Sequence, residues 1–199
     1  MKKKFIVLLF FIISLTNSNF NIAYSISPDV FIQSTVNRAS MVLSKDIPKL
    51  EKMEQLKIIA KKTVDIEAIG FYSLGNSRKN LNRSQIENYS NLFEEYFLKS
   101  FSSRLAEYTN PEIEVRDKKI LNKNYTIVNS ILVSTKDRPE IKIDWRVYTK
   151  DENNPLIRDL IIEGLSLART QKEEFSSIMS SNDDDINVLF EVLKNFSNN

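Results

Sequence analysis

The chain of 199 residues has room for one domain with a hydrophobic core, since 42% of its residues are hydrophobic. It contains neither Cys nor His, which excludes disulfide bonds, Ser-His-Asp and Cys-His catalysis, and the commonest zinc ligand. The 28 basic and 26 acidic residues give a net charge of +2, and this near balance gives no indication of nucleic-acid binding.

The first 25 residues have the three-part pattern of a secretory signal peptide. Lysines at positions 2–4 precede an apolar run over residues 5–13, and Ala23 and Ser25 supply the small side chains of a cleavage site after Ser25. The apolar run is too short to cross a membrane, which takes roughly 20 residues. Without residues 1–25 the chain holds 25 basic and 26 acidic residues, a net charge of −1. We therefore expect an exported protein.

Residues 26–110 are expected to be mainly helical because their apolar residues recur every three to four positions. Helices are predicted over residues 29–44, 47–62 and 65–72, and Gly75 is expected to end the third. The strongest helix begins at Asn82, which forms a capping-box sequence with Gln85. This helix is predicted to end near Tyr108, and it carries an aromatic stripe made of Tyr89, Phe93, Phe97 and Phe101.

Residues 111–165 change to the two-residue alternation of β-strands. Strands are predicted over residues 113–118, 125–134, 140–150 and 156–163. Their short connections make neighbouring strands antiparallel. The final segment, residues 166–199, returns to helix over 166–180 and 184–196. This order predicts a single α+β domain over residues 26–199, in which a curved four-stranded antiparallel sheet packs against several helices and encloses an apolar space.

Two stretches of the chain have the sequence blocks of a known family. The first is VDIEAIGFYSLG at residues 64–75, followed by the aromatic helix. The second contains, in order, Trp145-Arg146, Asp159, Glu163-Gly164, Ser166-Leu167 and Phe175. In order and spacing these blocks resemble the MlaC-like, or toluene-tolerance, family, and the resemblance covers about residues 29–196. Two surface segments depart from the family pattern, namely Asn153-Asn154-Pro155 and Thr170-Gln171-Lys172.

The resemblance implies a periplasmic phospholipid shuttle. Such a protein carries lipid between an outer-membrane lipoprotein–porin complex and the lipid-binding subunit of an inner-membrane ABC transporter, and so maintains the lipid asymmetry of the outer membrane. It holds acyl chains in a deep pocket between sheet and helices and catalyses no reaction. We therefore expect phospholipid as ligand, no cofactor, no metal, no nucleic-acid partner and a monomer.

The candidate pocket walls are the apolar faces of these elements. On the clearest strand they are Ile141, Ile143, Trp145 and Val147, and Ile127 and Ile131 are expected to extend that face on the neighbouring strand. Leu160 and Ile162 of the last strand add to the wall, and the stripe of Tyr89, Phe93, Phe97 and Phe101 forms the helical side. An apolar strand face opposite an aromatic helix is ordinarily plain core. Periodicity therefore leaves both a lipid pocket and a filled core open.

Charged residues leave further alternatives open. Arg146 and Arg158 are candidates for binding a lipid phosphate because a guanidinium presents a planar fork of donors, but each is equally a surface partner for Asp144 or Asp159. An isomerase-like enzyme would instead need one of these carboxylates buried in the pocket. A third class, a periplasmic adaptor or chaperone, would show a filled core and an exposed apolar groove.

Overall fold

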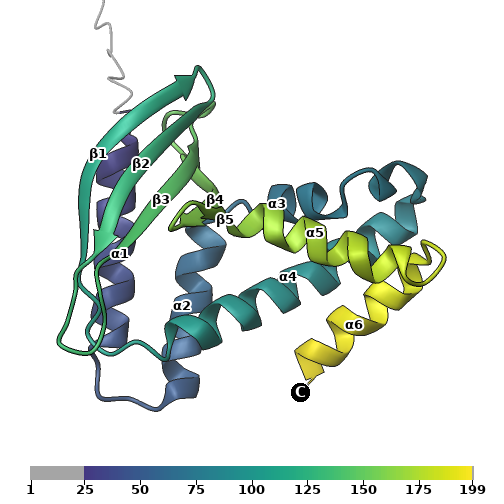
Figure 1. Ribbon diagram of the computed structural model, residues 1–199, viewed down its shortest axis with the longest axis horizontal. Coiled ribbons are helices and arrows are strands. Elements are labelled where there is room, and N and C mark those ends of the chain that lie inside the picture. Colours follow the sequence, from purple (N-terminus) through teal and green to yellow (C-terminus); the bar gives the residue numbers. More distant parts are fainter. Residues whose placement is uncertain (1–24, 199) are drawn as a thin grey trace, which may run out of the picture.

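A computed structural model of the protein describes residues 25–198, so the expected signal peptide lies outside the described residues except for Ser25. Four α-helices come first, followed by the strands and then two more helices (Figure 1). This arrangement confirms the predicted α+β class. Within the described range, no helix is both long enough and apolar enough to span a membrane.

The first four α-helices match the predicted positions closely. They are α1 (Pro28–Leu43), α2 (Lys49–Thr63), α3 (Ile66–Leu74) and α4 (Arg83–Leu105), with a short 3-10 helix η1 (Ser77–Asn80) before α4. The capping box of α4 is confirmed, because the Gln85 amide donates to the Asn82 side chain at 2.9 Å and the Asn82 amide donates to the Gln85 side chain at 3.0 Å. Gly75 follows α3 with a φ of 57°, a conformation that glycine adopts without steric cost.

The strands form one sheet in the order β1-β2-β3-β4-β5 with antiparallel neighbours. Four of them are the predicted strands, now bounded as β1 (Ile113–Asn122), β2 (Tyr125–Leu132), β3 (Ile141–Tyr148) and β4 (Leu156–Ile162). The prediction of four strands missed β5 (Leu165–Ser166), which is only two residues long. It forms because Glu163 and Gly164, with φ of 49° and 84°, turn the chain back on β4.

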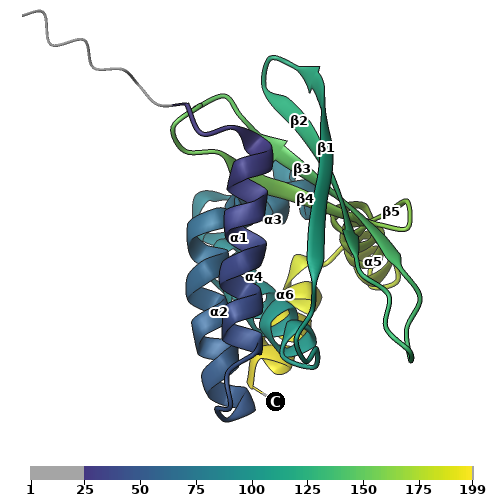
Figure 2. The same ribbon diagram turned by 90° about the vertical axis from the view of Figure 1, so that its left-hand side faces the viewer.

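The sheet has two unlike faces. One face, which we call the inner face, carries Val128, Ser130 and Leu132 of β2 opposite Trp145, Ile143 and Ile141 of β3. Residues directly across from one another on paired strands share a face, so Leu160 and Ile162 of β4 lie on it too. Helix α1 packs on β1 and β2 from this side, and Ile32 and Val36 of α1 join the same hydrophobic core (Figure 2).

The expected position of Ile127 and Ile131 is wrong. Ile127 pairs with Arg146 and Ile131 pairs with Lys142, which places both on the outer face, away from Trp145. The sequence of β2 is apolar at consecutive positions, so alternation alone did not decide which set turned inward. The register with β3 decides it, and the inward set on β2 is the one that contains Val128 and Ser130.

The helices form a second layer that continues the core. Helix α4 packs against α2, α3 and α6 (Ile186–Asn198), while α5 (Leu167–Ser180) packs against α3, α6 and β4. One hydrophobic cluster runs from Ile32 in α1 through the inner face to Leu193 in α6. Figure 1 shows α4 running from α3 toward the start of β1, so the two ends of its aromatic stripe lie in different surroundings.

Candidate functional site

Trp145 lies at the middle of the inner face and is the only Trp of the chain. Its indole Nε1 donates a hydrogen bond of 2.8 Å to the Ser130 hydroxyl, which in turn donates to the Ile143 carbonyl at 3.0 Å. Both partners are buried. Since the one polar atom of the indole is satisfied inside the sheet, the rest of the ring is purely apolar wall.

The apolar side chains around Trp145 are graded in burial. Val147 is fully buried and Ile143 nearly so, whereas Ile141, Leu160 and Ile162 are half-buried. Ile113 and Val115 of β1 are also half-buried and share the inner face, because they pair with Leu132 and Ser130. The inner face therefore ends in apolar surface that the protein itself covers only in part.

The aromatic stripe of α4 divides into two halves. Tyr89 and Phe93 are 0% and 2% exposed, and the Tyr89 hydroxyl donates to the Gly70 carbonyl at 2.9 Å. Gly70 lets α3 approach this closely, since a Cβ there would lie 2.7 Å from the Phe93 ring. Burial also raises the pKa of Tyr89 well above its ordinary value. These two predicted lipid contacts are thus occupied in packing α4 on α3.

Phe97 and Phe101 form the other half of the stripe. Their rings are stacked with centroids 5.7 Å apart and an angle of 9° between planes. Both side chains pack against the core but remain half-buried. Of the four predicted aromatic residues, these two therefore retain apolar surface that a ligand could cover.

Both predicted headgroup arginines are engaged on the side away from Trp145. The Arg158 guanidinium contacts the Asp65 carboxylate through Nε and Nη2 at 2.8 Å, donates from Nη1 to the Tyr125 hydroxyl at 2.9 Å, and stacks 3.5 Å from the centroid of Tyr148. Although burial lowers the pKa of Arg158, its hydrogen bonds to Tyr125 and Asp65 outweigh that effect and raise it. This pairing with Asp65, which caps α3, was not anticipated from the sequence.

Arg146 does pair with one of its expected surface partners. Its Nη1 lies 3.5 Å from the Asp159 carboxylate, directly across the β3–β4 register. Asp159 is buried and also accepts hydrogen bonds from the Ser166 hydroxyl at 2.7 Å and the Ala168 amide at 3.1 Å. The carboxylate thereby fastens the start of α5 to the sheet.

The positions of Asp144 and Asp159 also test the alternative of an isomerase-like enzyme, which needs a carboxylate in the pocket. Asp144 lies on the outer face and accepts a hydrogen bond of 2.7 Å from Asn129, its partner in register. Asp159 shares that face with Arg146. Neither carboxylate that we considered for catalysis points into the space beside Trp145. Residues 25–198 also contain no group of three or more acidic side chains that could hold a metal ion.

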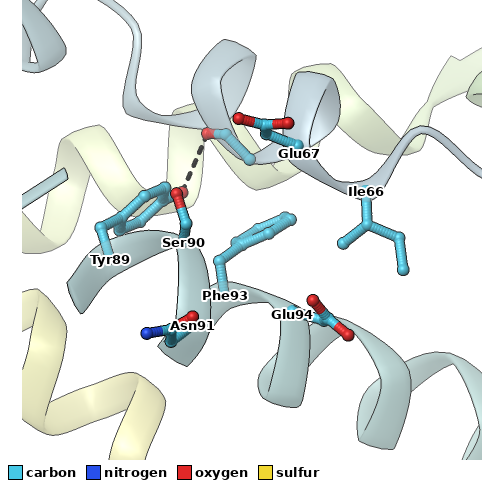
Figure 3. Close-up of a pocket in the computed structure, with 8 residues that line it drawn as sticks. Ile66, Glu67, Tyr89, Ser90, Asn91, Phe93 and Glu94 are labelled. Carbon is cyan, nitrogen blue, oxygen red and sulfur yellow. Dashed lines mark hydrogen bonds between the residues drawn. The ribbon is translucent and has the colours of Figure 1, made fainter. Parts of the chain in front are cut away.

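A small cleft lies elsewhere, between α3 and α4 (Figure 3). Its volume is about 150 Å³, and ligand pockets for drug-sized molecules are roughly 300–1,000 Å³. Figure 3 shows the Phe93 ring pointing from α4 toward α3, with the hydrogen bond of Tyr89 beside it. None of its lining residues lies on the sheet. The deep apolar pocket between sheet and helices stays a prediction.

Comparison with known proteins shows which family the sequence matches and which solved structure has a similar fold. The family model described as MlaC protein matches residues 33–195. No curated protein matches the chain in sequence. Among solved structures, the chain is similar to the phospholipid-binding protein from Ralstonia solanacearum in complex with a phospholipid, with a TM-score of 0.74 and 17% sequence identity. The likeness covers 86% of this chain and 97% of that one, so the two share a fold over nearly their whole lengths.

Proposed function

The chain belongs to the MlaC family, and on that premise we propose that it is a periplasmic phospholipid-binding carrier rather than an enzyme. The observation that carries the proposal is the apolar inner face around Trp145, where the indole N–H is hydrogen-bonded to Ser130 and the surrounding apolar side chains are in part only half-buried. The Ralstonia protein of the same fold holds a phospholipid, which supports this ligand class. The signal peptide expected at residues 1–25 supports export.

The acyl chains would lie between the inner face and the Phe97–Phe101 stack. Each buried CH₂ group contributes about 0.8 kcal/mol, so a wall of branched and aromatic side chains is sufficient for binding. On the sheet the proposed contacts are Ile141, Ile143, Trp145, Val147, Leu160 and Ile162. Tyr89 and Phe93 would support the helical side from behind, because they are buried against α3. Ile127 and Ile131 lie on the other face and are left out of this site.

The headgroup would remain at the edge of this space, in contact with water. Arg146 and Arg158 bind protein carboxylates on the outer face, so we do not assign the phosphate to either of them. Freeing Arg158 would leave the carboxylate of Asp65 without its cation, which makes exchange of partners costly.

The carrier would act as a monomer between two membrane complexes. The family resemblance supports an outer-membrane lipoprotein–porin complex on one side and the lipid-binding subunit of an inner-membrane ABC transporter on the other. In this role the protein contributes to outer-membrane lipid asymmetry. Its own part is to shield acyl chains from water during transit.

The test is to purify the protein from the periplasm of a bacterial host without detergent and to measure its mass under native conditions. We expect an adduct that yields phospholipid on organic extraction. The double substitution Phe97→Ser/Phe101→Ser should reduce the bound fraction. The matched control is Ile127→Ser/Ile131→Ser, which changes two half-buried apolar side chains on the outer face and should leave the lipid in place. A bare polypeptide mass with no uptake from liposomes would overturn the proposal.

A further inference from the structure

The tip of the β1–β2 hairpin exposes large apolar side chains that are not needed for binding acyl chains in the interior. The tip projects past the start of α1, beyond the helical layer, in two views at right angles (Figures 1 and 2). The last seven residues of β1 are all exposed, with Ile120 at 73% and Leu121 at 45%. Two adjacent large apolar side chains thus stand in water at the end of a protruding ribbon.

The strand pairing of the ribbon is irregular at these two side chains. Ile120 pairs with Thr126 and so belongs to the inner face, while Leu121 lies in the register irregularity between Ile120 and Asn122. Leu121 is therefore an extra residue in the ladder, and a bulge of this kind interrupts the alternation of side chains between faces. The interfacial zone of a lipid bilayer surrounds an inserted tip, so it covers both side chains whichever way each of them points.

Basic residues outnumber acidic ones at the end of the ribbon, since residues 116–124 contain four basic side chains and one acidic side chain, Asp117. Lys119 and Lys123 are exposed, and neither makes an ion pair with another residue of the range 25–198. Lys118, just before them, is engaged by Asp29 at 2.6 Å. Two acidic residues lie on the neighbouring β3–β4 turn. The Asp151 carboxylate accepts from the Asn153 amide and from the Asn154 side chain, and Glu152 is exposed.

We propose that the hairpin tip, residues 119–123, binds the surface of membranes that contain anionic phospholipid. Ile120 and Leu121 enter the zone between headgroups and acyl chains, and the ammonium groups of Lys119 and Lys123 contact lipid phosphates on either side. The surface contact is distinct from the cargo site, since the tip lies outside the core that contains Trp145. A carrier that rests on the bilayer in this way would be held near its lipid source or acceptor.

The proposal is tested by sedimenting the periplasmic protein with vesicles of phosphatidylethanolamine and phosphatidylglycerol, and separately with vesicles of phosphatidylcholine alone. We expect binding to the anionic vesicles, weakening with added salt, and little to the neutral ones. Ile120→Ser/Leu121→Ser should weaken binding about tenfold, given the apolar area withdrawn from the bilayer. Lys119→Gln/Lys123→Gln should weaken it about fivefold per lysine.

The control is Leu50→Ser/Ile58→Ser on α2, where the two side chains are 75% and 56% exposed and nearby Lys49 and Lys57 have glutamate partners. It should bind vesicles like the unchanged protein. All variants should keep their co-purified phospholipid, which separates failure of this proposal from failure of the cargo proposal. Sedimentation that is equal for the tip variants and the unchanged protein would overturn the surface contact. The proposal would also be overturned, in favour of a protein partner, by a second result. In that result the unchanged protein does not bind vesicles, and the tip variants no longer transfer lipid to a membrane-protein acceptor.

Discussion

The hydrogen bond between Trp145 and Ser130 gives the sharpest test of the inner face. Replacing Ser130 by Ala removes the acceptor of the indole N–H, and at 9% exposure the indole has little access to water as a substitute. An unsatisfied buried donor costs about 1–3 kcal/mol. For a chain of this size each kcal/mol lowers Tm by roughly 2–4 °C. We therefore expect Ser130→Ala to lower both the free energy of unfolding and Tm measurably.

The assay is urea denaturation followed by far-ultraviolet circular dichroism, applied to a double-mutant cycle with Trp145→Phe. Phe has no donor to leave unsatisfied, so Ser130→Ala should cost less than about 1 kcal/mol in that background. Ser102→Ala is the control, because Ser102 is equally buried but bonds only a carbonyl of its own helix at 3.4 Å. An equal cost of Ser130→Ala in the unchanged protein and in the Trp145→Phe variant would refute the assigned hydrogen bond.

Three further predictions concern the framework around the site. Gly70→Val should lower the free energy of unfolding by about 2–3 kcal/mol, because a Cβ at this position would lie 2.7 Å from the buried Phe93 ring. Thermal denaturation measures the effect, and an unchanged Tm for the smaller substitution Gly70→Ser would contradict this packing. Arg158→Ala should lower stability by about 1–3 kcal/mol, because it leaves the Asp65 carboxylate without its cation and the Tyr125 hydroxyl without its donor. The lipid content in native mass spectra should stay unchanged, and loss of lipid with intact stability would instead assign Arg158 to the headgroup. Hydrogen bonds from Lys118 and Ser27 lower the pKa of Asp29 to about 2 from 3.8, so its contribution is present above pH 3.8 and lost as the pH falls toward 2. Asp29→Asn should therefore cost less than about 1 kcal/mol near neutral pH, given the exposure of Asp29. Acid titration of stability should show this cost shrinking below pH 3.8 and vanishing as the pH falls through about 2.

Local sequence determined most of the secondary structure. The capping box of Asn82 and Gln85, the glycine at position 75 and the short turns between strands act within a few residues, so they are readable without the fold. The order of helices, strands and helices then restricted the class to α+β. The family resemblance, carried by blocks such as Trp145-Arg146, agrees with the match over residues 33–195.

Tertiary structure alone decided which predicted site residues come together. Alternation marks two faces on every strand, but only the pairing of β2 with β3 shows that Val128 and Ser130, rather than Ile127 and Ile131, lie beside Trp145. Ser130 was missed because a serine in an apolar strand has no local sign of an indole partner 15 positions away. Arg158 likewise finds Asp65 across 93 positions. Such contacts depend on elements distant in sequence meeting in space, and periodicity, which is a local property, cannot specify them.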